Sequence, residues 1–200
     1  MGAKSTVTPC RDASVAPRPQ RADAVRNRVR ILEAAEIVFA SEGIEVPIDV
    51  IAEKAGVGVG TLYRHFPTKE KLCEAILYER LGELAADARA LAEAPDPVAA
   101  FFGFVDHVFE EASAKRDLMV AVMGAGVEFE ASIAPVKDEL HDALGVLLAR
   151  AQEAGAVRAD VSAEAIMALV SATCQAAAHS SGNANDLLCI VCDGLRSPST

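Results

Sequence analysis

Apolar residues recur every three or four positions along most of the chain, and no stretch shows the alternation typical of a β-strand. The first helical stretch covers residues 22–42 and is followed by Gly43, which is placed to end a helix. Its apolar positions are Val25, Val29, Leu32, Ala35 and Phe39. The spacing therefore predicts one long helix at the start of the chain.

Two short helices follow, joined by the corner Gly56-Val57-Gly58. Pro47 suits the start of the first, whose apolar face is formed by Ile48, Ile51, Ala52 and Ala55. The second covers residues 59–66 and is ended by Pro67. Thr68 can cap the next helix, which runs towards Leu91.

The remaining sequence also predicts helices. They cover 98–113, a stretch from Pro135 to Ala154, a stretch capped by Ser162, and 185–195. Around 119–129 the pattern is apolar but interrupted by glycine, which indicates a short or kinked element. The fold class is therefore all-α with about nine helices.

The two short helices behind a longer one form a helix-turn-helix motif. The second helix is predicted to bury Val59, Leu62 and Phe66. Its outer side carries groups that can form hydrogen bonds, namely Gly60, Thr61, Tyr63, Arg64 and His65. Such a helix fits the major groove of DNA and contacts base edges with its N-terminal half.

At these residues the chain resembles the TetR/AcrR family of bacterial repressors. The resemblance rests on residues 51–57, on Gly60-Thr61-Leu62-Tyr63-Arg64-His65-Phe66, and on Thr68-Lys69-Glu70 with Leu72. It implies a helix-turn-helix DNA-binding domain over 21–67 and a helical effector-binding and dimerisation domain over 68–200. Residues 1–20, which mix Ser, Thr, Pro and Arg, are predicted from their composition to form a flexible basic arm.

The resemblance also implies roles for individual residues. Thr61 and Gly60 would face bases, whereas Tyr63, His65 and Lys69 would contact phosphates, as Arg64 can. The family usually has a hydroxyl residue at the start of each short helix, where this chain has Val46-Pro47 and Gly58. We expect the arginine-rich arm before the first helix to replace the missing contacts, and Arg26 and Arg28 are further candidates for DNA binding. The alternatives are that Tyr63 and Phe66 are core aromatics and that Arg64 is a solvated surface charge.

Charge is distributed unevenly along the chain, whose formal net charge is −10. Residues 1–78 hold 11 basic and 10 acidic side chains, whereas the other 122 residues hold 8 and 19. Seven of the basic residues lie within residues 1–30. A basic leading segment on an acidic body favours a polyanionic partner at one end, although a solvated arm without a partner has the same composition.

The last two-thirds of the chain are predicted to hold a sensor and a dimer interface. The resemblance implies an inducer cavity within the middle helices and a four-helix bundle formed by the last two helices with a second subunit. Small residues along 162–180 independently favour close helix contact. The candidate effector-binding residues are Phe101, Phe102, Val105, His107, Met119, Met123, Glu128, Phe129, Leu144 and Cys174; the alternative for each is ordinary core.

No catalytic constellation is present, and the carboxylates of Glu110-Glu111 are interpreted as solvated surface. Cys189 and Cys192 form a C-x-x-C pair, for which packing in a helix is favoured over a metal or thiol sensor. We expect no metal and no cofactor. Five scattered cysteines suit a reducing cytoplasm, and no apolar run is long enough to cross a bilayer.

The sequence therefore predicts a homodimeric DNA-binding regulator that is released from a double-stranded, palindromic operator by a small-molecule effector. Three alternatives stay open. They are a constitutive or partner-gated DNA-binding regulator without a pocket, an enzyme, and a purely structural helical module. The effector and the operator sequence cannot be read from the residues.

Overall fold

The computed structural model describes residues 18–114, 118, 127–179 and 184–198, and these form eight helices. They are α1 (Arg18–Glu42), α2 (Ile48–Ala55), α3 (Val59–His65), α4 (Lys69–Leu91), α5 (Pro97–Ala114), α7 (Val127–Glu153), α8 (Ala163–His179) and α9 (Ala184–Leu195). The predicted all-α class is confirmed. Nine helices were expected, and most of the additional element predicted around 119–129 lies outside the described residues.

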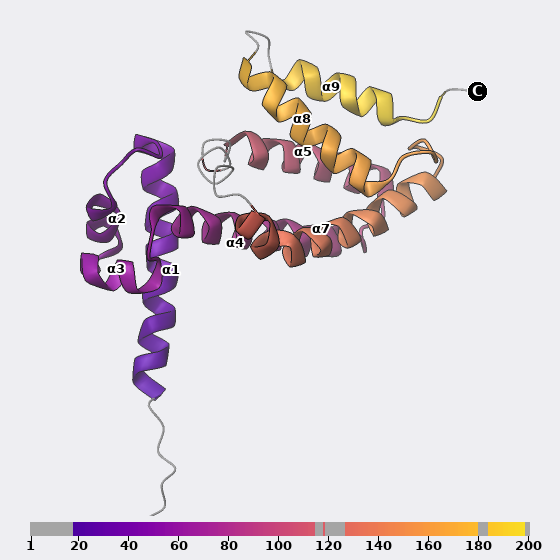
Figure 1. The fold of residues 1–200 in the computed structure, drawn as a ribbon. Coiled ribbons are helices and arrows are strands. Elements are labelled where there is room, and N and C mark those ends of the chain that lie inside the picture. Colours follow the sequence, from indigo (N-terminus) through magenta and orange to yellow (C-terminus); the bar gives the residue numbers. More distant parts are fainter. Residues whose placement is uncertain (1–17, 115–117, 119–126, 180–183, 199–200) are drawn as a thin grey trace, which may run out of the picture.

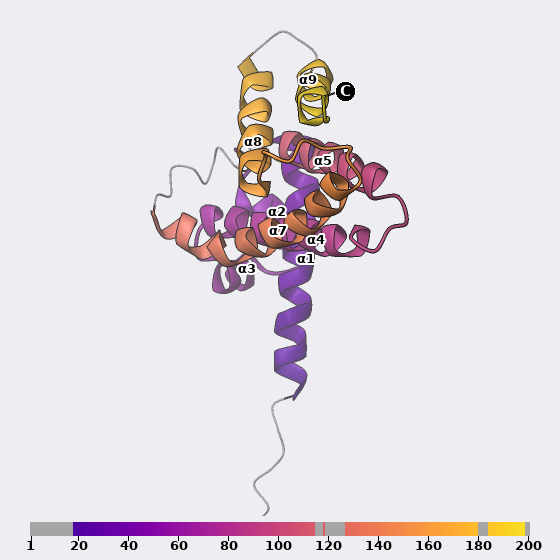
Figure 2. The ribbon, with the colours of Figure 1, turned by 90° about the vertical axis from the view of Figure 1, so that its right-hand side faces the viewer.

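The helices form two groups that share α4 (Figure 1). Helices α1, α2 and α3 pack together at one end, and α4 leads from them into the second group. There α4 and α7 run alongside each other and make the most extensive helix contact, and α5 packs against both. Helices α8 and α9 lie side by side on the far side of α5 (Figure 2).

Local signals set most helix ends where the sequence placed them. Gly43 ends α1 with φ +83°, a conformation that glycine adopts without steric cost. The Thr68 hydroxyl accepts a hydrogen bond from the backbone N–H of Lys71 at 3.2 Å, and the Ser162 hydroxyl accepts one from Ala165 at 3.2 Å. Both predicted caps are therefore confirmed. A third cap, Asp96, accepts from the first turn of α5.

The prediction that a helix begins at Pro135 is wrong, because α7 begins at Val127 and continues through the proline. A proline inside a helix removes one backbone hydrogen bond, which favours a break. Here Pro135 is exposed, whereas Ile133 and Val136 beside it are buried. Burial on both sides of the proline stabilises one continuous helix.

Two hydrophobic cores meet on α4. The first contains residues of α1, α2, α3 and the first half of α4, together with Phe129, Ile133 and Val136 of α7. The second contains the other half of α4, α5, the rest of α7, and residues of α8 and α9. Leu81 packs against both cores. Because α4 and α7 each run through both cores, the two groups of helices are joined by two rigid elements.

The first turns of α1 lie outside the first core. Val25 and Val29, predicted on its apolar face, are 64% and 46% exposed, whereas Leu32 and Ala35 are buried. Helix α1 begins at Arg18 and extends well beyond α2 and α3 (Figure 1). Within the described ranges, no helix combines the length and apolar character that a membrane span needs.

Candidate DNA-binding surface

The corner between α2 and α3 is held by Gly56. Its φ of +63° is left-handed, and its N–H donates to the carbonyls of Ala52 and Glu53. A Cβ at this position would lie 2.5 Å from Nη2 of Arg30, which donates to the Gly56 carbonyl at 3.4 Å. The left-handed backbone therefore favours glycine here, and a Cβ would also displace the flexible end of the Arg30 side chain.

Helix α3 is held by two apolar side chains and presents polar ones outward. Leu62 and Phe66 are buried, at 0% and 2% exposed. Val59 is 37% exposed, so the prediction that it faces inward is wrong, because the first turn of α3 projects beyond the core. The remaining positions are the exposed Gly60, Tyr63 and Arg64 and the half-buried Thr61 and His65.

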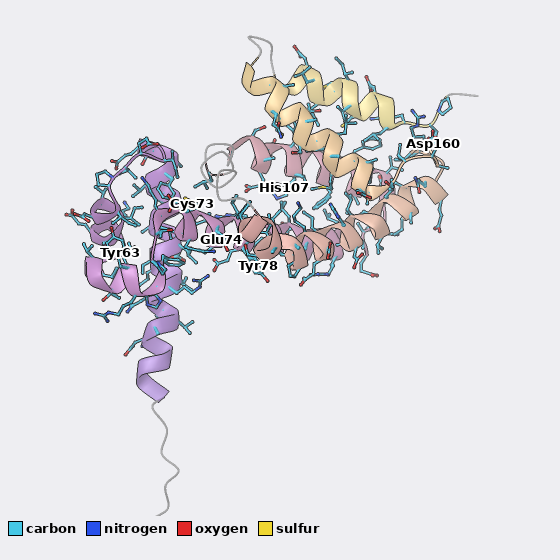
Figure 3. The ribbon with its side chains drawn as sticks, in the orientation of Figure 1. Tyr63, Cys73, Glu74, Tyr78, His107 and Asp160 are labelled. Carbon is cyan, nitrogen blue, oxygen red and sulfur yellow. The ribbon has the colours of Figure 1, made fainter. Side chains whose placement is uncertain are left out.

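All five polar or glycine positions predicted to contact DNA thus lie together on one short helix. Tyr63 is 47% exposed, which excludes the alternative that it is a core aromatic (Figure 3). Phe66 is the core aromatic of this pair. Within the described part of the chain, the Arg64 guanidinium has no hydrogen bond or ion pair. A cation without a protein partner can bind a phosphate without losing an existing contact.

The other three predicted DNA-contacting cations have partners within the protein. Nζ of Lys69 donates to the carbonyl of Val46 at 2.7 Å, between α1 and α2. The Arg28 guanidinium lies 4.8 Å from the Phe66 ring centroid and 3.9 Å from the Glu79 carboxylate. Arg26 pairs with Asp23 on the exposed part of α1. Their contacts with phosphate stay predictions.

Neither short helix has a side-chain cap. Pro47 precedes α2 and Gly58 precedes α3, and neither residue forms a side-chain capping hydrogen bond. Gly58 has an ordinary φ of −69° and open space where a Cβ would stand. Glycine is therefore not required at this position by the backbone, in contrast to Gly56.

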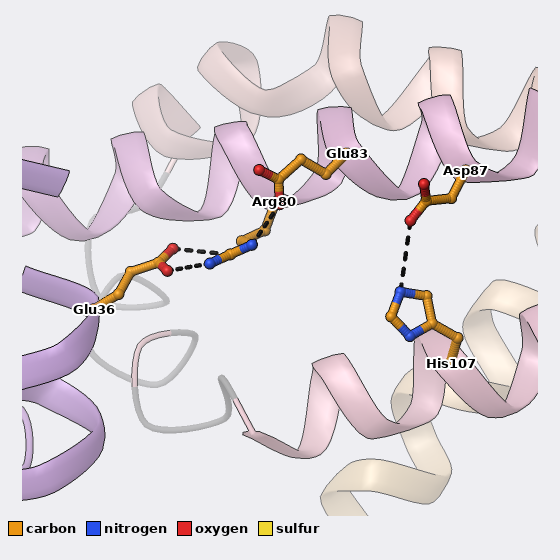
Figure 4. A network of polar contacts seen from close by, with 5 residues as sticks. All are labelled: Glu36, Arg80, Glu83, Asp87 and His107. Atoms are coloured by element: carbon orange, nitrogen blue, oxygen red, sulfur yellow. Dashed lines mark hydrogen bonds and ion pairs between the residues drawn. The ribbon is translucent and has the colours of Figure 1, made fainter. Parts of the chain in front are cut away.

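An ion-pair cluster joins α1 to α4 close to this surface (Figure 4). Arg80 on α4 donates from Nε to Oε1 of Glu36 on α1 at 2.8 Å and from Nη2 to the other carboxylate oxygen. It also pairs with Glu83, one turn along α4. The hydrogen bonds to Glu36 hold the pKa of Arg80 above its ordinary value. This two-point contact fixes the direction in which α4 leaves the first group of helices.

The candidate effector-binding residues are not all brought together. Phe101, Val105 and Leu144 are buried in the second core. Phe102 faces the C-terminal segment, where the Arg196 guanidinium lies 4.4 Å from its ring centroid. Phe129 belongs to the first core, on the DNA-binding side. Met119 and Met123 lie outside the described residues, as does the side chain of Glu128.

The two remaining polar candidates lie at different helix contacts. Nε2 of His107 on α5 lies 3.7 Å from Oδ2 of Asp87 on α4 (Figures 3 and 4). Cys174 on α8 is buried against α5, where its Sγ donates to the carbonyl of Phe109 at 3.8 Å. Whether either contacts an effector stays a prediction.

Sequence reasoning missed Glu111, which was interpreted as solvated surface together with Glu110. Glu110 is exposed, but Glu111 is half-buried. Its Oε2 is buried and has no hydrogen-bond partner among the described residues. The signal that could have found it is helical phase, because residue 111 lies seven positions after Phe104, on the buried face of α5.

The C-x-x-C pair lies on α9, where Cys189 is exposed and Cys192 is partly buried. Burial, together with the nearby Asp106 carboxylate, raises the pKa of the Cys192 thiol to about 11. A thiol that stays protonated is a poor nucleophile and metal ligand. Among the described residues, no three histidine, cysteine or acidic side chains are grouped as a metal site.

Two parts of the sequence match known protein domains. Residues 31–76 match the description "Bacterial regulatory proteins, tetR family". Residues 96–197, half of the chain, match "Transcriptional regulator SbtR-like, C-terminal domain". An HTH-type transcriptional regulator of Staphylococcus aureus is 45% identical over 62 residues, which are 30% of this chain and 34% of that protein. The match therefore covers about a third of the length of this relative.

Solved structures match over much more of the chain. The TetR transcription regulatory protein from Mycobacterium vanbaalenii is 41% identical with a TM-score of 0.67, over 89% of this chain and 99% of that one. A TetR transcriptional regulator from Streptomyces coelicolor is 31% identical with a TM-score of 0.64, over 86% and 99%. The regulator RolR shares the fold at 21% identity with a TM-score of 0.59, over 88% and 90%.

The fold and the exposed face of α3 define a helix-turn-helix DNA-binding protein. The matches over both halves of the sequence show that the chain belongs to the TetR family of transcriptional regulators.

Proposed function

We propose that this regulator is a homodimeric repressor that leaves a palindromic operator when a small molecule binds its C-terminal domain. The observation that carries the proposal is the passage of α4 and α7 through both hydrophobic cores. A rearrangement around the second core would change the packing of Leu81 and Val136, and through them the position of the DNA-binding helices. Such shared packing would couple the two sites, which is what regulation by an effector requires.

The dimer interface is proposed on α8 and α9. The outer side of α8 carries a stripe of exposed small and apolar residues at helical spacing, which is Ala165, Ala168, Leu169, Ala172 and Ala176. On α9, Ile190 is 68% exposed. Small residues allow close helix contact, and apolar residues gain from burial, so a second copy of this chain fits the face.

The proposed DNA contacts are made by α3 and by the N-terminal turns of α1. Tyr63, Arg64 and His65 would bind phosphates, while Thr61 and Gly60 would approach base edges. The start of α1 projects beyond the first core and carries Arg26, which is exposed. We propose that Arg26 meets the DNA backbone beside the groove that α3 enters.

The Glu36–Arg80 pair would transmit the change between the domains. Arg80 lies one residue before Leu81, where the two cores meet. Arg28 and Glu79 add a second, longer contact between α1 and α4 at 3.9 Å. A shift of α4 would therefore move α1, and with it α3, as one body.

One solved structure bears on the effector. The structure of RolR was solved in complex with resorcinol, and at 21% identity this supports only the capacity of the fold to hold a small molecule. The alternative is a regulator gated by a partner protein, with no small-molecule site. We propose no catalytic role and a cytoplasmic location, as expected for a protein that acts on chromosomal DNA.

The proposal is tested by operator release. An operator is first selected from random DNA with the purified protein. The operator is then labelled with a fluorophore, and its fluorescence anisotropy reports protein binding during a small-molecule screen. An effector should weaken operator binding, and the operator should weaken effector binding by the same factor. Compounds that bind free and DNA-bound protein equally would contradict regulation by an effector. If no compound in a chemically diverse screen releases the operator, gating by a partner protein would be favoured.

A further inference from the structure

One oxygen of a half-buried carboxylate in the C-terminal domain is shielded from solvent and has no partner among the described residues. Oε2 of Glu111 is shielded from solvent and accepts no hydrogen bond from any described residue. A buried carboxylate oxygen that lacks a donor is unfavourable, so such groups are rare unless they serve a ligand or a reaction. The proposed DNA-binding surface and dimer interface do not use this residue.

Helix geometry places Glu111 on the interior side of α5. Residue 111 lies seven positions after Phe104, on the same face of the helix, and Phe104 is 0% exposed. The opposite face contacts the outer helices, since Ser113 approaches Cys174 of α8 at 3.7 Å and Asp106 approaches Cys192 of α9 at 3.9 Å. Glu111 therefore faces α4 and α7, against which α5 packs.

Acidic side chains outnumber basic ones in the C-terminal part of the chain as a whole. His107, one turn before Glu111, faces Asp87, and Arg80 on α4 already faces Glu36 and Glu83 (Figure 4). Residues 79–200 hold 8 basic and 19 acidic side chains. An anionic ligand would be repelled here, whereas a cation would complete the hydrogen bonding of Oε2 and reduce the excess negative charge.

We infer that Glu111 is the polar anchor for an effector that carries a protonated amine on an apolar body. The amine donates to Oε2, and the apolar body packs among the aromatic side chains of α5, beginning with Phe104. This inference rests on the proposed function, and it names the chemical class of the effector.

The test compares compounds that differ only in their charged end. Phenylethyl, phenylbutyl and octyl skeletons are each used as the amine, the alcohol and the carboxylate, with binding measured by calorimetry on the full-length protein. The amines should bind about tenfold more tightly than the alcohols of the same skeleton. In Glu111→Gln this preference should disappear, while in the exposed control Glu110→Gln it should remain.

Thermal unfolding checks that the variant is folded. Glu111→Gln should melt at the same temperature as the wild type or above it, because the substitution removes an unpaired charge. A lower melting temperature would mean that the carboxylate stabilises the fold, and it would overturn the inference. Amines that bind no better than alcohols or carboxylates, or that do not bind at about 1 mM, would also overturn it.

Failure of this inference is distinguishable from failure of the proposed function. If neutral or anionic compounds release the operator and amines do not, the regulator has an effector of another class. If compounds of no charge class release it, the proposed function itself fails.

Discussion

The two halves of this molecule use polar residues in opposite ways. In the N-terminal half, Leu62 and Phe66 anchor α3 so that Tyr63 and Arg64 stand in solvent. In the C-terminal half, Cys174 is buried between α8 and α5, and one carboxylate oxygen of Glu111 is shielded from solvent. An exposed face suits a large, invariant partner such as duplex DNA, whereas enclosed groups suit a small ligand whose chemistry differs from one regulator to another.

The two halves nevertheless share two helices, α4 and α7. The first core takes Phe129, Ile133 and Val136 from α7, and the second takes Leu84 and Ala88 from α4. The halves are therefore distinct in function but not separable in packing. The predictions below test how far this holds.

The largest effects should come from the two cores. Phe66→Ala and Phe104→Ala each remove a buried ring, and each should lower the free energy of unfolding by about 3–5 kcal/mol. Because α4 and α7 run through both cores, each variant should still unfold in a single calorimetric transition. A second transition, in which the C-terminal helices survive the loss of the first core in Phe66→Ala, would show that the halves are independent.

The contact between α1 and α4 should have the next largest effect. Glu36→Ala and Arg80→Ala should each lower the free energy of unfolding by about 2 kcal/mol. A double-mutant cycle should give a coupling energy of about 1–2 kcal/mol, because the pair forms two hydrogen bonds and is partly buried. The matched control is the exposed pair Arg89 and Glu139 between α4 and α7, whose coupling should stay below about 0.5 kcal/mol. Equal coupling energies in the two cycles would contradict a special role of Arg80 in joining α1 to α4.

Arg64→Ala should weaken operator binding without changing stability. Loss of one phosphate contact should cost about 1–3 kcal/mol and reduce the slope of log affinity against log salt by about 1. The control is the exposed Arg158, which pairs with Asp160 at the end of the molecule far from α3 (Figure 3). Arg158→Ala should leave both the affinity and the salt slope unchanged. An unchanged salt slope in Arg64→Ala would mean that this guanidinium is a solvated surface charge.

The smallest expected effect is an increase in stability and in operator affinity. Gly58→Ser places a hydroxyl at the start of α3, where a Cβ meets nothing within 4 Å and φ is −69°. Capping should stabilise the protein by a few tenths of a kcal/mol, and the hydroxyl should add a phosphate contact that tightens operator binding. Gly58→Ala has no hydroxyl and should give neither gain. Equal behaviour of the two variants in thermal and DNA-binding assays would exclude the hydroxyl as the cause.

The sequence predicts the N-terminal half better than the C-terminal half for a physical reason. Helix-turn-helix geometry depends on local signals, such as the glycine corner at Gly56 and the cap at Thr68, which can be read from neighbouring residues. The exposure of Val59 was missed because the edge of a core is set by tertiary packing. Pro135 was misjudged for the same reason, since long-range burial overcame a local helix breaker.

The interior of the C-terminal half is set by helix packing that a single sequence does not specify. Phe129 lies in the first core, and Phe102 faces Arg196, and neither placement can be read from the sequence. Their contact with an effector stays a prediction. Glu111 resembles a surface residue beside Glu110, and only the phase of α5 shields one of its carboxylate oxygens. Such placements depend on contacts between residues far apart in the chain.

Two copies of the α3 surface should bind DNA together, and selection of bound sites from random duplex DNA with the purified protein measures this. The selection should enrich an inverted repeat with half-sites about one helical turn apart or a multiple of it, and the affinity should fall steeply with salt. Enrichment of an asymmetric site would contradict this expectation. Failure of the folded, dimeric protein to enrich any site would contradict it as well.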